Sequence, residues 1–251
     1  QNEEEDKRLP ELYKLNPKAF EKEIAHSKKA LLRELDEFII SEKPSESFIH
    51  IALSNINYNY YSRKELYLSS KKVVSSHKQI LYPENFFTYR DSIQLNDNTL
   101  KNYYTYYQFI NRYLDNLADD GHKKEETFFN KTSYEHQTQK LRLIDSLITN
   151  KQLHDNLLYN TVKRYLIHAD DSKKEHDLVA LFKKLDHNEL HQKEVERYAH
   201  NTAKINAGEL IPNLALITGN NKIISLQKIN ASKTVFFFWN SKSVKHYKEI
   251  H

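Results

Sequence analysis

Ser243 and His246, close to the end of the sequence, form one of two residue groups that could carry chemistry. On a helix, residues three apart are neighbours, so this serine and histidine could be paired as nucleophile and base. No acidic residue that would orient the histidine and no oxyanion-binding feature can be identified beside them. A Ser–His pair at this spacing is common by chance, so we do not expect hydrolysis.

The second group is a possible metal site in the segment 187–205. His187 and His191 are four residues apart, and Glu194 lies one turn further on, so the three could face one cation. The order is His-Asn-Glu-Leu-His rather than His-Glu-x-x-His, which misplaces the general base of a metalloprotease. A solvated polar helix is the preferred interpretation, with His187 and His191 kept as the alternative metal ligands. We expect no cofactor.

Composition excludes several other chemistries. The 251 residues contain no cysteine, so disulfides, thiolate metal sites and cysteine nucleophiles are excluded within them. With three glycines, Gly121, Gly208 and Gly219, neither a G-x-G-x-x-G nor a G-x-x-x-x-G-K-[ST] phosphate-binding loop can be written. No apolar run approaches the roughly 18 residues of a membrane-spanning helix, so we expect no transmembrane span.

Tyrosine is abundant, with 17 residues, and two clusters lie over 58–67 and 103–113. Aromatic rings interleaved with basic residues could stack on nucleic-acid bases. The net charge is only +4, however, and the lysines and arginines are scattered rather than arranged along one face. Packing of these rings in a core is therefore favoured, and no nucleic acid is expected as a partner.

The first 205 residues have the periodicity of helices. We expect a flexible acidic leader over 1–15 and an α-helical domain over 16–205 made of antiparallel hairpins. Asn16-Pro17 is a typical helix start and Pro44 a helix end. The first helix has the apolar stripe Phe20, Ile24, Leu31, Leu35, Phe38 and Ile39. Further helices are expected from Ser45, from Tyr82-Pro83, after Asn96-Asp97, and over 133–150, 152–168, 172–185 and 187–205.

After Ile205 the pattern changes to that of strands. Two short apolar segments flank a turn at Thr218–Asn221, which predicts a β-hairpin over 213–226. The continuous apolar run at 234–239 is typical of a strand buried on both faces. Because that strand would need neighbours, we expect the natural chain to continue beyond His251. A helix is expected from Ser241.

From Gly208 onwards the sequence resembles the opening of a thioredoxin-like domain of the TlpA/AhpC type. In that family a Gly-x-x-x-Pro strand leads to a hairpin, an x-Ser-Leu triplet and a buried strand ending in Phe-Trp. Gly208 with Pro212, the turn at Gly219, the triplet at Ser225 and the strand end at Trp239 match this order. The helical region in front is similar to the N-terminal regions of TlpA-like proteins of Bacteroidetes. The resemblance therefore implies a mainly α region followed by the start, 208–251, of an α/β thioredoxin-like domain.

In that family Trp-Cys-x-x-Cys opens the active-site helix, and here the two cysteine positions fall on Ser243 and His246. Neither side chain can exchange a disulfide. The resemblance thus implies a degenerate redox site at Trp239, Ser243 and His246, with no catalytic residue. Thioredoxin-like folds bind extended peptides beside this helix, so Trp239, Lys242 and Lys245 are candidate partner-binding or peptide-binding residues.

These expectations favour a non-catalytic thioredoxin-like protein of the bacterial cell envelope, periplasmic or associated with the outer membrane. It would be an interaction subunit of a larger assembly, with other envelope proteins, within a membrane-protein complex, as partners. Because position 1 is not Met, we expect that a leading segment has been removed, and a lipid anchor before residue 1 would suit the acidic leader. Two alternatives stay open: a thiol-disulfide oxidoreductase whose cysteines lie outside this sequence, and a purely structural helical scaffold.

Overall fold

The chain divides into two compact units, Gln1–Ala203 and Lys204–His251. The computed structural model describes residues 10–74, 80–120, 130–169, 171–203, 213–229 and 233–234. Within them the first unit is built of α-helices, and the second contains a two-stranded sheet. The mainly α character predicted from the sequence is confirmed, whereas the thioredoxin-like α/β continuation stays a prediction.

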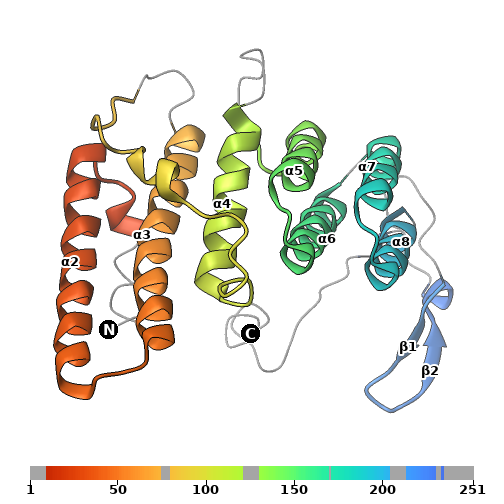
Figure 1. Cartoon of the computed structure of the whole chain (residues 1–251). Helices are drawn as coiled ribbons and strands as arrows, with labels where there is room; N and C mark the ends of the chain where they lie inside the picture. Colours follow the sequence, from red (N-terminus) through yellow and green to blue (C-terminus); the bar gives the residue numbers. More distant parts are fainter. Residues whose placement is uncertain are drawn as a thin grey trace. The chain divides into compact units, whose positions relative to one another are not determined.

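The first unit includes a long antiparallel helical hairpin, α2 and α3 (Figure 1). α2 spans Pro17–Glu42 and α3 spans Glu46–Val74. As predicted, the Asn16 side chain caps α2 by accepting a hydrogen bond from the Ala19 N–H, and Pro17 lies in the first turn. At the other end the N–H of Lys43 closes the last turn on the Ile39 carbonyl.

Further α-helices follow along the chain and pack on their sequence neighbours (Figure 1). α3 packs on α4, α4 on α5 and α5 on α6, while α7 contacts α5 and α6, and α8 contacts α6 and α7. The bounds are Tyr104–Asp120 for α4, Tyr134–Leu147 for α5, Lys151–His168 for α6, Ser172–Leu185 for α7 and Glu189–Ala203 for α8. None of the described helices has the length and apolar character needed to cross a bilayer.

Two apolar cores hold these helices together. The larger core collects side chains from α4 to α8, with Tyr58 of α3. Its fully buried members include Phe109, Ile110, Leu114, Leu141, Ile144, Leu157, Leu158, Val162, Leu178, Phe182 and Val195. The smaller core joins α2, α3 and the segment after α3 through Phe20, Ile24, Tyr67, Leu68 and Phe86.

The tyrosine clusters contribute to both cores. Tyr58 and Tyr67 of the first cluster and Tyr106 of the second are buried, which confirms the predicted core packing for these rings. Tyr67 stacks on Phe20 with ring centroids 3.9 Å apart. Tyr104, by contrast, is exposed.

The predicted helix start at Tyr82-Pro83 is wrong. Turns follow Pro83, and the regular element there is a short 3-10 helix, η1 (Thr88–Ser92). The Phe86 N–H donates to the Pro83 carbonyl at 2.9 Å, and the Phe86 ring enters the smaller core. The apolar side chain is buried by the turn itself, so no α-helix is needed to place it.

The apolar stripe predicted along α2 is correct only in part. Phe20, Ile24 and Leu35 are buried, but Leu31 and Phe38 are exposed. The smaller core covers α2 at Phe20 and Ile24, near its start, and it does not extend to the far end of the helix. The hairpin end therefore keeps apolar side chains at the surface.

In the second unit the predicted β-hairpin is present. β1 (Ala215–Ile217) and β2 (Ile223–Ser225) pair antiparallel, and η2 (Leu226–Lys228) follows. The turn is closed by the Thr218 N–H, which donates to the Lys222 carbonyl at 2.9 Å. Asn221 adopts a left-handed conformation with φ 57°, which asparagine tolerates well. The run 235–239 and the helix expected from Ser241 lie outside the described residues.

We expect Phe20→Ala and Phe38→Ala to differ strongly in effect, although both remove a phenyl ring from α2. Phe20 is fully buried, so its loss should lower the free energy of unfolding by about 3–5 kcal/mol. Phe38 is exposed, and its loss should cost less than about 1 kcal/mol. Urea unfolding followed by circular dichroism measures both, and equal effects would contradict the core boundary along α2.

Candidate functional site

The site residues expected from the thioredoxin resemblance all lie outside the described residues. These residues are Trp239, Lys242, Ser243, Lys245 and His246. The degenerate redox site and its peptide-binding role therefore stay predictions from the sequence.

The two histidines considered as metal ligands have different environments. His187 is exposed and precedes α8, whereas His191 lies in its first turn. The Nδ1 atom of His191 is 3.0 Å from Oδ2 of the buried Asp186, and its ring stacks on Tyr159. Within the described residues no group of three or more His, Cys, Asp or Glu side chains could hold a metal ion. His191 is thus paired with a carboxylate that holds the α7–α8 connection.

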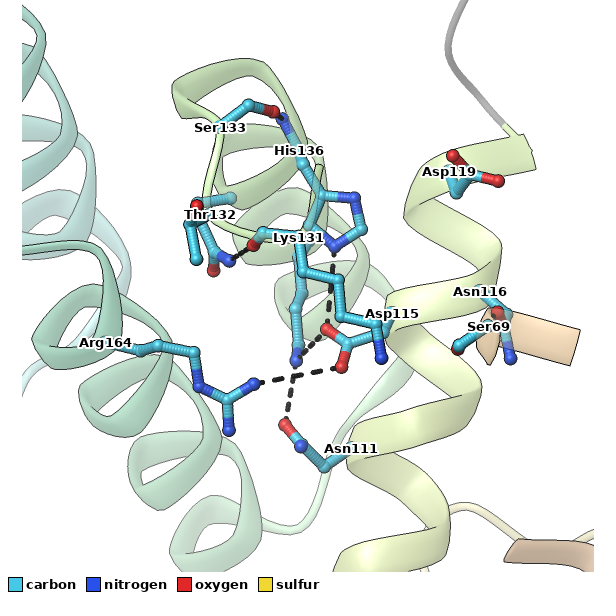
Figure 2. Close-up of polar contacts among 12 residues, drawn as sticks. Ser69, Asn111, Asp115, Asn116, Asp119, Lys131, Thr132, Ser133, His136 and Arg164 are labelled. Atoms are coloured by element: carbon cyan, nitrogen blue, oxygen red, sulfur yellow. Dashed lines mark hydrogen bonds and ion pairs between the residues drawn. The ribbon is translucent and has the colours of Figure 1, made fainter. Parts of the chain in front are cut away.

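The most unusual polar arrangement is a buried cluster around Asp115 of α4 (Figure 2). Lys140 of α5 donates hydrogen bonds to Asp115 and, at 2.8 Å, to Oδ1 of Asn111. His136 Nε2 is 3.5 Å from Asp115 Oδ1, and Arg164 Nη1 of α6 is 3.9 Å from Oδ2. One carboxylate thereby links three helices.

Helix geometry explains how these groups meet. Asn111 and Asp115 are four residues apart on α4, and His136 and Lys140 are four apart on α5, so each pair shares one face. The start of α5 is set by Ser133, whose hydroxyl accepts a hydrogen bond from the His136 N–H. The cap fixes where α5 begins, and His136 and Lys140 lie on the face of α5 that meets α4.

Opposing effects act on the pKa values of the cluster. Burial alone would raise the pKa of Asp115, but the Lys140 ammonium, with His136 beside it, holds that pKa far below its usual range. Burial lowers the pKa of Lys140, and the Asp115 carboxylate opposes this change. Burial also lowers the pKa of the nearby Lys131.

This cluster is suited to holding helices rather than to catalysis. A lysine nucleophile must present a neutral amine to a substrate. Lys140 is 1 % exposed, and its ammonium group already donates to Asp115 and Asn111. Removing either charge would leave the other buried without its partner, which is strongly destabilising.

A second buried network lies on the α3 side of α4. The carboxylate of Glu65, fully buried on α3, accepts two hydrogen bonds from Arg90 at 2.8 and 2.9 Å and one from the Tyr89 hydroxyl. The Glu65 carboxylate also accepts a hydrogen bond of 2.6 Å from Nδ2 of Asn116. Oδ1 of Asn116 in turn accepts a hydrogen bond from the Ser69 hydroxyl. Asn116 directly follows Asp115, so adjacent residues of α4 tie this helix to α3 and to α5.

Comparison of the chain with protein-family models, with curated proteins and with solved structures finds no match. The thioredoxin-like resemblance therefore rests on the sequence alone, chiefly on residues 208–251. The properties of the helical unit must be inferred from its own geometry.

Neither buried network was singled out in the sequence. A single charged residue among polar neighbours is normally at the surface, and Lys and Asp are seldom fully buried. The sequence signal that could have indicated burial is the position of these charges relative to apolar residues. Lys140 precedes the buried Ile144 by four residues, and Asp115 follows the buried Leu114. Such positions mark charges that fall on or beside an apolar stripe.

We predict that Asp115→Asn lowers the free energy of unfolding by about 3–5 kcal/mol, because Lys140 stays buried without a counter-charge. The matched control is Asp119→Asn, one turn further along α4, which removes a partly exposed pair with Lys72 and should cost about 0–1 kcal/mol. Denaturant unfolding measures both. Should Asp115→Asn fail to fold, Asp115→Leu combined with Lys140→Leu removes both charges and is expected to be more stable than Asp115→Asn. A double variant no better than the single one would contradict the pairing.

Acid should remove the contribution of Asp115. Its folded pKa lies below its unfolded value of about 3.9, so the unfolded state binds the proton first as the pH falls. The stability difference between the wild type and Asp115→Asn should therefore shrink as the pH falls below about 4. Thermal melts at a series of pH values test this, and a difference that grows in acid would overturn the assignment.

Proposed function

We propose that this chain is a non-catalytic interaction protein whose helical unit binds another protein through the free end of the α2–α3 hairpin. We call this end the α2–α3 tip and define it by Leu31, Phe38 and Phe48. The proposal is carried by the exposure of these side chains, of which 38, 42 and 45 % respectively is accessible.

Two of the three side chains are in contact, and the third lies on the same side of α2. Leu31 and Phe38 are seven residues apart on α2 and so project from the same side of the helix. Phe38 lies against Phe48 of α3, with ring centroids 5.5 Å apart. Clustered exposed apolar side chains with a polar rim are typical of protein-binding surfaces, whereas isolated ones are not.

The rim of the tip is acidic although the whole chain is basic. Residues 31–50 contain two basic residues, Arg33 and Lys43, against five acidic ones, Glu34, Asp36, Glu37, Glu42 and Glu46. A net charge of −3 in this segment, in a chain of net charge +4, favours a partner with apolar side chains flanked by basic groups.

The non-catalytic part of the proposal is supported by what the chain offers chemically. None of its 251 residues is a cysteine, so thiol–disulfide exchange cannot proceed on these residues. Three of the buried charged groups described, Glu65, Lys140 and Asp115, are engaged with other side chains. The cell-envelope location and the thioredoxin-like continuation are proposed from the resemblance of 208–251.

The test is partner recovery with the full natural chain, tagged and cross-linked in its source. The double variant Phe38→Ser, Phe48→Ser should reduce recovery of the bound protein at least about tenfold, since it removes two apolar anchors. Its melting temperature should be nearly unchanged, because both side chains are exposed.

The matched control is Leu190→Ser, which also replaces an exposed apolar side chain but lies on α8. It should leave partner recovery unchanged. Equal recovery of the bound protein by the wild type, the tip variant and the control would contradict the proposal. Failure of the wild type to recover any protein would also contradict it.

A further inference from the structure

A polar groove of about 620 Å³ opens beside the first turns of α6 and α8, away from the α2–α3 tip residues. Amide side chains dominate its lining: Asn96, Asn98, Asn150, Gln152 and Asn188. The volume is within the range of about 300–1,000 Å³ that small-molecule and peptide sites occupy. The other lining residues are two lysines, a threonine and one aspartate.

The orientation of the amides follows from their fixed contacts. Asn150 caps α6, because its Oδ1 accepts a hydrogen bond from the Leu153 N–H at 3.1 Å, so its Nδ2 must point the other way. That Nδ2 donates a hydrogen bond to Oδ1 of Asn98 at 2.6 Å. The oxygen of Asn98 is therefore turned towards Asn150, and the Asn98 Nδ2 is turned away from it. Asn188 is fixed similarly, because its Oδ1 accepts from the N–H groups of Leu190 and His191.

The groove consequently presents a surplus of hydrogen-bond donors. The oxygens of Asn98 and Asn188 are used by the protein, and among the described residues no hydrogen bond from either Nδ2 is recorded. Lys101 adds a half-buried ammonium group to the same lining. Two N–H₂ groups and an ammonium group suit a ligand that is rich in hydrogen-bond acceptors and negatively charged.

The charge of the groove limits the ligand to a single negative group. Lys151 is paired with Asp155 at 2.8 Å, so within the lining these two charges balance and Lys101 supplies the net charge. One net positive charge neutralises a single carboxylate, whereas a doubly charged phosphate would keep an unbalanced negative charge. No aromatic side chain belongs to the described lining, so a nucleobase would find no ring to stack on.

We propose that this groove binds the free C-terminal carboxylate of an extended peptide. The carboxylate would accept hydrogen bonds from Nδ2 of Asn98 and Asn188 and pair with Lys101. The volume of the groove is several times that of a lone carboxylate, so part of the peptide backbone would also lie in it. The amide of Gln152 suits such a backbone. Gln152 donates its Nε2 to Asn102 and so keeps its oxygen to accept a backbone N–H.

The experiment is a titration of the ¹⁵N-labelled full chain with N-acetyl-penta-alanine that has a free carboxylate. The side-chain N–H₂ signals of Asn98 and Asn188 are assigned with Asn98→Asp and Asn188→Asp. These variants keep the oxygen that the protein uses and replace only the free donor. Both signals should shift and saturate in the wild type. The same peptide with a C-terminal amide should bind at least about tenfold more weakly.

Lys101→Gln should weaken binding several-fold, whereas Lys18→Gln, an exposed lysine on α2, should have no effect. The proposal is overturned if neither N–H₂ signal moves up to about 10 mM peptide, or if the peptide amide shifts both signals equally. Acetate giving the same shifts at equal concentration would overturn the peptide as the occupant.

Discussion

The buried ion pair between Asp115 and Lys140 constrains the rest of the helical unit. A charge removed from water is costly unless its partner lies at the right distance and the remaining hydrogen bonds are made. Here the pair is completed by Asn111, and His136 and Arg164 lie close to the same carboxylate. The apolar contacts between α4 and α5 therefore have to be compatible with the geometry of this pair. Arg164 of α6 lies close to the same carboxylate, so the cluster also bears on the position of α6.

The two surfaces proposed for binding lie outside the cores and buried networks that hold α4. Asn116 joins α4 to the Glu65 network of α3 immediately beside the Asp115 cluster. The smaller core continues this packing to Phe20 and then ends, so the α2–α3 tip projects from it. The amide-lined groove lies where α6 and α8 begin, beside the segment that precedes α4. Rigid helices with free ends position such surfaces more accurately than loops do.

Local rules predicted the elements well but not the buried charges. Asn16 and Ser133 cap α2 and α5 as their residue types indicate, because a cap depends on residues within one turn. The error at Tyr82-Pro83 arose because Phe86 is buried by a turn, and periodicity alone cannot distinguish a buried turn from a helix. The Asp115–Lys140 contact joins residues 25 apart in the chain, and nothing local to either residue reveals the other.

The distribution of perturbed groups bears on the choice between a binding protein and an enzyme. Catalytic sites combine a perturbed titratable group with access to a substrate. Two of the perturbed groups of the helical unit are closed off: Lys140 is covered, and the hydroxyl of the buried Tyr89 donates to Glu65. Buried ion pairs add little net stability compared with apolar side chains, whereas removing one partner of a pair is strongly destabilising. Closed buried charges together with exposed amide and apolar groups suit the binding role proposed for this unit.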